Sequence, residues 1–181
     1  MHEQILRELI SLVSGSRTPS IADKAALQKA YAFAVAAHAG QKYGKGKNAK
    51  LYHEHCTDVS SHLWACGAPH KVVVAGLLHD VLEDNLNITP ELLAEAGFPE
   101  EVIAIVQTVT RNPGESYDAY IDRIADSRNV CAIGLKLVDL TVNLDNNPTA
   151  KQKAKYSKHA ERLAKLCLEL TSKDEAAPSH N

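Results

Sequence analysis

The fold is decided by residues 72–84, which read VVVAGLLHDVLED. The first seven of these residues are apolar, and so short a run fits either a buried strand or a buried helix. Pro69 suits the first turn of a helix, and the chain lacks the clear polar–apolar alternation that is typical of strands. We therefore expect residues 72–78 to form a buried helix in an all-α protein.

Helical patterns also flank this segment, with breaks at Gly and Pro. We expect further helices near residues 2–13, 20–38, 56–66, 89–97, 99–110, 117–125, 129–145 and 149–171. Residues 40–50 are rich in lysine and glycine and are expected to form a cationic loop. The resulting division is an N-terminal helix and linker (1–19), one domain (20–171) and a polar, flexible C-terminal tail (172–181).

Length and charge limit the possible functions. The chain has 181 residues, and 20 Lys+Arg against 22 Asp+Glu give a net charge of −2, so nothing in its overall charge attracts nucleic acid or anionic lipid. The longest apolar run, 72–78, is far shorter than the ~20 residues of a membrane span, and charged residues interrupt the N-terminal segment. The four cysteines occur singly, which favours reduced thiols. We expect a cytoplasmic protein that acts on a small molecule, with its oligomeric state open.

The residues that follow the apolar run carry the chemistry. His79, Asp80, Glu83 and Asp84 are ionisable groups that are costly to bury without partners. On a helix, residues four apart share a face, so His79 would lie beside Glu83 and Asp80 beside Asp84. A capped, solvated helix end would explain this segment equally well if it stood alone.

Two other segments favour a metal site. Tyr52-His53-Glu54-His55 supplies imidazoles, and Asp139 follows an apolar stretch that should be buried. Two imidazoles and two carboxylates suit a borderline or hard divalent ion rather than a thiolate zinc site. His53 is an alternative ligand to His55, because both would face one way on an extended segment.

The order of these residues resembles a known family. His55, then His79-Asp80, then Asp139 reproduce the H…HD…D pattern of the HD-domain metal-dependent phosphohydrolases. The flanking motifs over residues 24–165 resemble the hydrolase domain of Rel/Spo-type alarmone enzymes, and the small stand-alone alarmone hydrolases most of all. These motifs are Y-x-x-H at 52–55, LLHD-x-x-ED at 77–84, KL-x-D-x-x-x-NL at 136–144 and H-x-G-Q at 38–41.

This resemblance implies a single HD-domain helical bundle with one Mn²⁺ held by His55, His79, Asp80 and Asp139. It further implies that Glu83 and Asp84 form the catalytic pair for attack by water. Family members remove the 3′-pyrophosphate of guanosine tetra- or pentaphosphate, releasing pyrophosphate and GDP or GTP. The resemblance assigns substrate contacts to Asn143 and Tyr156.

The sequence departs from the family on the base-recognition side. The position of the arginine that stacks on guanine is Tyr43 here, which offers an aromatic face without charge. We expect Tyr43 to contact the base and Lys42, Lys45 and Lys47 to meet phosphate.

Two alternatives remain open at this point. One keeps the site but changes the substrate to an adenine alarmone, the 2′-phosphate of NADPH or another nucleotide. The other is a non-catalytic module that binds nucleotide and metal. A complete set of metal-ligand and acid–base residues argues against the second alternative.

Overall fold

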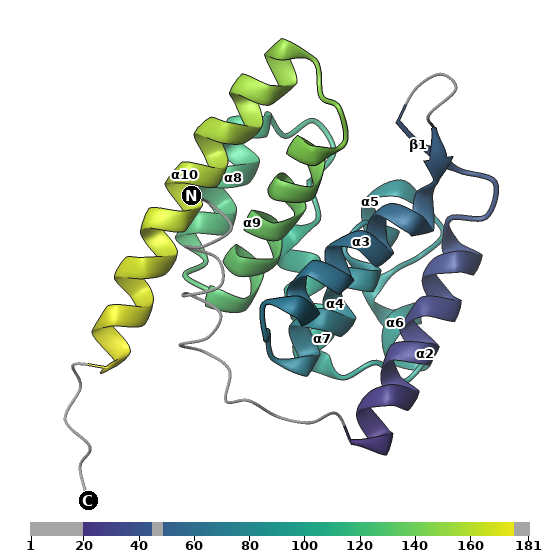
Figure 1. Cartoon of the computed structure of the whole chain (residues 1–181). Helices are drawn as coiled ribbons and strands as arrows, with labels where there is room; N and C mark the ends of the chain where they lie inside the picture. The colour runs from purple at the N-terminus through teal and green to yellow at the C-terminus, as the bar shows by residue number, and fades with distance from the viewer. Residues whose placement is uncertain (1–19, 45–48, 176–181) are drawn as a thin grey trace, which may run out of the picture.

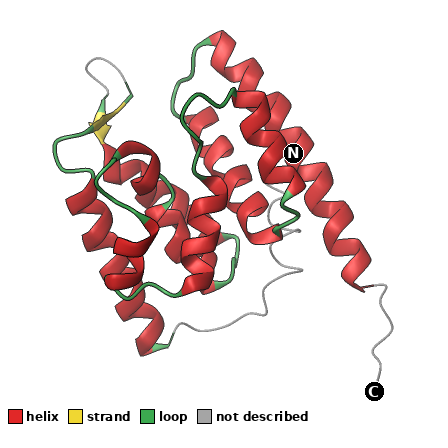
Figure 2. Cartoon of the chain, turned by 180° about the vertical axis from the view of Figure 1, so that it is seen from behind, coloured by secondary structure: helices red, strands yellow, loops and turns green. Residues whose placement is uncertain are grey.

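The computed structural model describes residues 20–44 and 49–175, with side chains up to residue 172. In chain order the elements are α2 (Ile21–Ala37), β1 (Lys42–Tyr43), β2 (Lys50–Leu51), α3 (Tyr52–Ala65), α4 (His70–Leu78), α5 (Val81–Asp84), α6 (Pro90–Glu95), α7 (Glu100–Val109), α8 (Tyr117–Asp126), α9 (Val130–Asp145) and α10 (Ala150–Glu175). The all-α prediction is confirmed, and Figures 1 and 2 show helices throughout except for one short antiparallel hairpin, β1–β2.

Helix α4 lies at the centre of the molecule, and every residue from 72 to 78 is buried. It packs against α2, α3, α7 and α9. Gly76 allows α3 to approach closely, because a Cβ at this position would lie 2.7 Å from Leu63 Cδ1 and 3.3 Å from the Ser60 Cα. The prediction that this apolar run is a helix is confirmed, and burial on all sides explains why it shows no amphipathic period.

The helices form two groups that α9 joins. In Figure 1, α8, α9 and α10 lie together on one side, and α2, α3, α4, α6 and α7 lie on the other. Helix α9 contacts α8 and α10 in its own group, and α3, α4 and α7 in the other group. Residues 135–140 of α9 are therefore buried, and Asp139 among them faces the other group rather than water.

Polar residues define where several helices begin. The Ser20 hydroxyl accepts from the Asp23 N–H while the Asp23 carboxylate accepts from the Ser20 N–H, which makes a capping box for α2. Asn129 caps α9 in a similar way by accepting from the Ala132 N–H. These caps place the starts of both helices within a residue or two of where the sequence predicts them.

Two expectations about local structure are wrong. Residues 79–84 do not continue one helix: α4 ends at Leu78, and α5 begins at Val81 after a turn at His79 and Asp80. The second correction concerns residues 52–55, which form the first turn of α3 rather than an extended segment before it.

Three further points concern the chain ends and membrane contact. The expected helix at 2–13 lies outside the described residues. Helix α10 continues to Glu175, past the expected domain end at 171. Among the described helices, none combines the length and the apolar character that a membrane crossing requires.

Candidate active site

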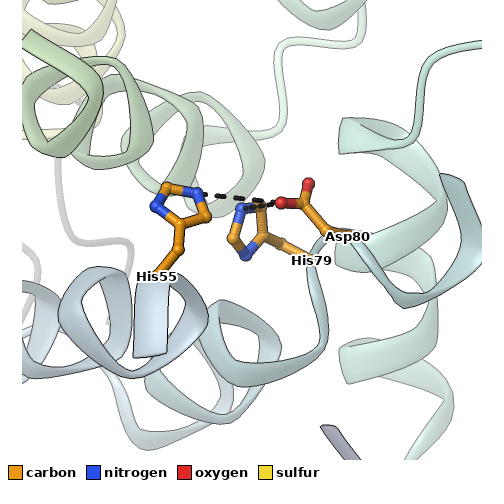
Figure 3. Close-up of side chains that lie close together, drawn as sticks. All are labelled: His55, His79 and Asp80. Atoms are coloured by element: carbon orange, nitrogen blue, oxygen red, sulfur yellow. Dashed lines mark ion pairs between the residues drawn. The ribbon is translucent and has the colours of Figure 1, made fainter. Parts of the chain in front are cut away.

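The turn between α4 and α5 presents two neighbouring side chains to the same point (Figure 3). His79 Nδ1 donates to the Gly76 carbonyl oxygen at 2.8 Å, so Nε2 carries the free lone pair. That Nε2 lies 3.1 Å from Asp80 Oδ2 and, although buried, has no hydrogen-bond partner among the described residues. A buried histidine whose Nδ1–H bonds a backbone carbonyl oxygen, and whose Nε2 is left without a hydrogen bond, is typical of a metal ligand.

His55 reaches the same point from α3. Its Nε2 lies 3.7 Å from Asp80 Oδ2 and 3.2 Å from Asp139 Oδ1. Ligand atoms of His55, His79 and Asp80 all lie within 4.8 Å of one another. His53 is about 200° away from His55 around the helix and contacts the edge of the Tyr31 ring instead. The alternative assignment of His53 as a ligand is therefore wrong.

Asp139 brings a second carboxylate from α9. Its Oδ1 lies 3.7 Å from His79 Nε2, and Asn143 Nδ2 donates to the same oxygen at 2.6 Å. Lys136 Nζ donates to Oδ2 at 2.7 Å, although both side chains are buried. Burial alone would raise the pKa of Asp139, but the Lys136 ammonium and the two histidines hold that pKa well below its usual range.

The four side chains suit a divalent ion. Two imidazoles and two carboxylates provide mixed nitrogen and oxygen donors, and the buried His79 Nε2 lacks any other partner among the described residues. The Tyr52 hydroxyl donates to Asp80 Oδ2 at 3.1 Å and so orients this carboxylate from outside the ligand set. Tyr52 and Lys136 occur in the Y-x-x-H and KL-x-D motifs, but nothing in the sequence alone indicates these roles.

Two further carboxylates, on Glu83 and Asp84, lie one turn beyond the His79–Asp80 pair. Burial raises the pKa of Glu83 more than a hydrogen bond from the Arg111 N–H lowers it, and burial also raises the pKa of Asp84. Carboxyl groups with raised pKa values beside a candidate metal site can accept or deliver protons.

The loop before α8 fixes the position of Glu83. The Arg111 N–H donates to Glu83 Oε2 at 3.1 Å, and Arg111 Nε lies 3.7 Å from Oε1. The guanidinium of Arg123 braces this loop by donating to the carbonyl oxygens of Thr108 at 3.0 Å and Thr110 at 2.7 Å. It also forms a two-bond ion pair with Glu115 at 2.9 and 3.0 Å. No motif in the sequence indicates this brace.

The hairpin places Tyr43 directly against the site. Its ring stacks on the His55 ring with centroids 4.1 Å apart and planes 1° apart, and its hydroxyl donates to Asn143 Oδ1. Lys42, beside it on β1, is exposed. Lys45 and Lys47 lie outside the described residues. The structure therefore brings together Tyr43 and Asn143 from the expected substrate contacts.

Tyr156 lies on α10 in a cluster with Tyr117. The two ring centroids are 6.4 Å apart, and Lys155 Nζ lies 4.8 Å from the Tyr156 centroid and 3.9 Å from that of Tyr117. Burial lowers the pKa of Lys155, and the nearby Lys136 and Arg111 charges lower it further. The expected nucleotide contact at Tyr156 therefore lies beside one cationic side chain, that of Lys155.

Comparison with known proteins agrees with this arrangement. Residues 30–119 match the family profile described as an HD domain, a range that includes His55, His79 and Asp80 but not Asp139. Over 131 residues, 68% of this chain, the sequence is 35% identical to a guanosine-3′,5′-bis(diphosphate) 3′-pyrophosphohydrolase of Aquifex aeolicus (strain VF5). The match spans 17% of that relative's length.

A solved structure shows the same fold. It belongs to a protein described as a metazoan ortholog of SpoT that hydrolyses ppGpp and plays a role in starvation responses. The TM-score is 0.66 at 22% identity, covering 87% of this chain and 96% of that one. Taken together, the sequence match, the all-α fold and the convergent histidines and aspartates show that this chain contains an HD domain.

Proposed function

We propose that the protein hydrolyses alarmones of the guanosine tetra- and pentaphosphate type, releasing pyrophosphate from the ribose 3′ position and leaving GDP or GTP. The single observation that carries this proposal is the convergence of His55, His79, Asp80 and Asp139, with Glu83 and Asp84 one turn away. The homology to the Aquifex pyrophosphohydrolase supports the choice of substrate class.

We assign His55, His79, Asp80 and Asp139 as ligands of one Mn²⁺. A divalent ion in such a site polarises a phosphoryl oxygen and lowers the pKa of water. The supporting observation is the donor set itself, which contains no thiolate and so favours a harder ion than a structural zinc site does. Buried Lys136 balances part of the charge of the two aspartates.

We assign proton transfer to the carboxyl groups of Glu83 and Asp84. Water attacks the phosphorus that carries the ribose 3′ oxygen, the bond between these two atoms breaks, and pyrophosphate leaves. An ionised carboxylate accepts the proton of the water, and a proton returns to the ribose oxygen. The raised pKa of each carboxyl group brings it closer to neutral pH, where proton transfer in both directions is efficient.

We place the nucleotide in the region between the hairpin and α10. Lys42 and Lys45 are proposed to meet phosphate, and Tyr43, Asn143 and Tyr156 to contact the nucleoside. The Lys155 ammonium, 4.8 Å from the Tyr156 ring centroid, supports this placement, because the substrate carries several negative charges.

A second candidate substrate rests on one specific observation. Where the family carries a guanine-stacking arginine, this chain carries Tyr43, whose ring is stacked on His55. This change favours a different base or phosphate position, such as an adenine alarmone or the 2′-phosphate of NADPH.

A nucleotide panel tests these proposals. The full chain is incubated with Mn²⁺ and guanosine tetraphosphate, its adenine counterpart or NADPH, and the release of pyrophosphate and of phosphate is measured separately. We expect pyrophosphate release to be fastest from the guanine substrate. Faster turnover of either alternative overturns the guanine assignment. Tight nucleotide binding without release of either product indicates the non-catalytic module. The Asp80→Ala variant is the control for contaminating phosphatases.

A further inference from the structure

The two histidines of the site differ in what holds their rings. His79 donates its Nδ1 proton to the Gly76 carbonyl oxygen, so the orientation of its ring is fixed. The corresponding Nδ1 of His55 is buried and has no hydrogen-bond partner among the described residues. Metal-bound histidines almost always use this second nitrogen to set the ring orientation. Some other contact must therefore hold His55.

Tyr43 supplies such a contact. Its ring lies parallel to the His55 ring at 4.1 Å between centroids, and only 2% of the His55 side chain is exposed. A parallel stack at this separation fixes the plane of the imidazole and covers one face of it. The contact therefore ties β1, which carries Tyr43, to the proposed ligand His55 on α3.

The hydroxyl of Tyr43 is connected to a second proposed ligand, Asp139, through Asn143. It donates to Asn143 Oδ1, and Asn143 Nδ2 donates to Asp139 Oδ1 at 2.6 Å and to the Asp139 carbonyl oxygen at 2.8 Å. These three hydrogen bonds leave Asn143 only one amide orientation, with its oxygen toward Tyr43 and its nitrogen toward Asp139. Because Asp139 Oδ1 lies 3.2 Å from His55 Nε2, the four side chains form a closed ring of contacts.

We propose that Tyr43 is a positioning residue for the metal site, which sets the orientation of His55 through its ring and that of Asp139 through Asn143. This proposal rests on the proposed function only in that the site binds a divalent ion. It assigns to Tyr43 a role different from that of the arginine at the family position. One side chain ties together ligands from α3 and α9, 84 positions apart in the chain.

The proposal predicts that metal affinity depends on Tyr43. Titration calorimetry with MnCl₂ is carried out on the full chain and on the Tyr43→Phe and Tyr43→Leu variants. We expect Tyr43→Leu, which loses both contacts, to weaken Mn²⁺ binding about 10–100-fold, in the range typical of partners that orient ligands. Tyr43→Phe, which keeps the stack, should weaken binding by a smaller factor. Tyr31→Phe is the matched control, because Tyr31 is exposed and contacts only His53 among the rings of this region.

Two further measurements separate positioning from the other possible roles. Excess Mn²⁺ should restore the kcat of Tyr43→Phe if the residue acts through the ion. Unchanged Mn²⁺ affinity in both variants, together with a raised KM for nucleotide, would overturn the proposal in favour of direct base contact. Thermal unfolding shows whether Tyr43→Leu has a folding defect. If it does, the milder variant Tyr43→Phe provides the test. Failure of the alarmone assignment leaves the calorimetric result intact, so the two hypotheses fail separately.

Discussion

The metal side and the nucleotide side of this protein are built differently. His55, His79 and Asp139 are almost fully buried, and they come from two core helices, α3 and α9, and from the turn that follows α4. Lys42 is exposed on a two-residue strand, and Tyr156 is half-buried on α10. The proposed ligands are thus fixed by packing that the whole fold depends on, whereas Lys42 lies at the surface, where a substitution disturbs no core contact. We therefore expect a substitution at Lys42 to alter substrate binding while metal binding is kept.

The strongest test of this comparison removes a ligand. Asp80→Ala should lower Mn²⁺ affinity by more than about 100-fold and abolish hydrolysis, because Asp80 Oδ2 lies within 4 Å of both imidazoles. Calorimetry with MnCl₂ and a pyrophosphate-release assay measure the two effects. Asp145→Ala, an exposed aspartate at the end of α9, is the control. Retention of either metal or activity in Asp80→Ala contradicts the ligand assignment.

The next test separates chemistry from metal binding. Glu83→Gln should reduce kcat about 100-fold while Mn²⁺ affinity stays near that of the parent, because Glu83 is assigned to proton transfer and not to coordination. A collapse of metal affinity comparable to that of Asp80→Ala would make Glu83 a ligand. Unchanged turnover would remove it from the mechanism.

The pH profile gives the same test a second readout. Burial raises the pKa of Glu83, and the base must be ionised to accept a proton from water. Activity of the parent should therefore fall as the pH decreases through the pKa of Glu83, which lies above the ordinary glutamate value. Above that pKa the carboxylate is ionised, and the activity should reach its full value. In Glu83→Gln the acidic limb should change, since only Asp84 still titrates there. An identical acidic limb in parent and variant would assign it to another group.

The smallest expected effect lies on the nucleotide side. Replacing Lys42, Lys45 and Lys47 with Gln should raise KM several-fold at low ionic strength and make KM less sensitive to salt, because fewer cations then attract the substrate. KM measured over a range of NaCl concentrations checks this. A triple variant with the same charge change at exposed Lys24, Lys158 and Lys165 is the control. Equal behaviour of the two triple variants would show that the loop makes no specific contact.

The convergence of His55, His79, Asp80 and Asp139 could be predicted from the sequence, whereas the contacts of Tyr43 could not, for a physical reason. Burial of the 72–78 run and the adjacent His79–Asp80 pair are encoded locally, and the family resemblance supplied His55 and Asp139. The stack of Tyr43 on His55 and its bond to Asn143 could not be predicted in this way, because Tyr43 and Asn143 are 100 positions apart and meet only once the fold has formed. The turn at His79 and Asp80 was also missed, since helix spacing alone cannot show where α4 stops.

Arg123 has a consequence for how the activity can change over evolution. This side chain is not in contact with any proposed ligand, yet it holds the carbonyl oxygens of Thr108 and Thr110, and Thr110 directly precedes Arg111, whose N–H holds Glu83. A substitution at Arg123 would leave the proposed acid–base groups unchanged and would still shift the backbone at Arg111 that holds Glu83. Homologous proteins with identical active-site residues can therefore differ in turnover through this one remote brace.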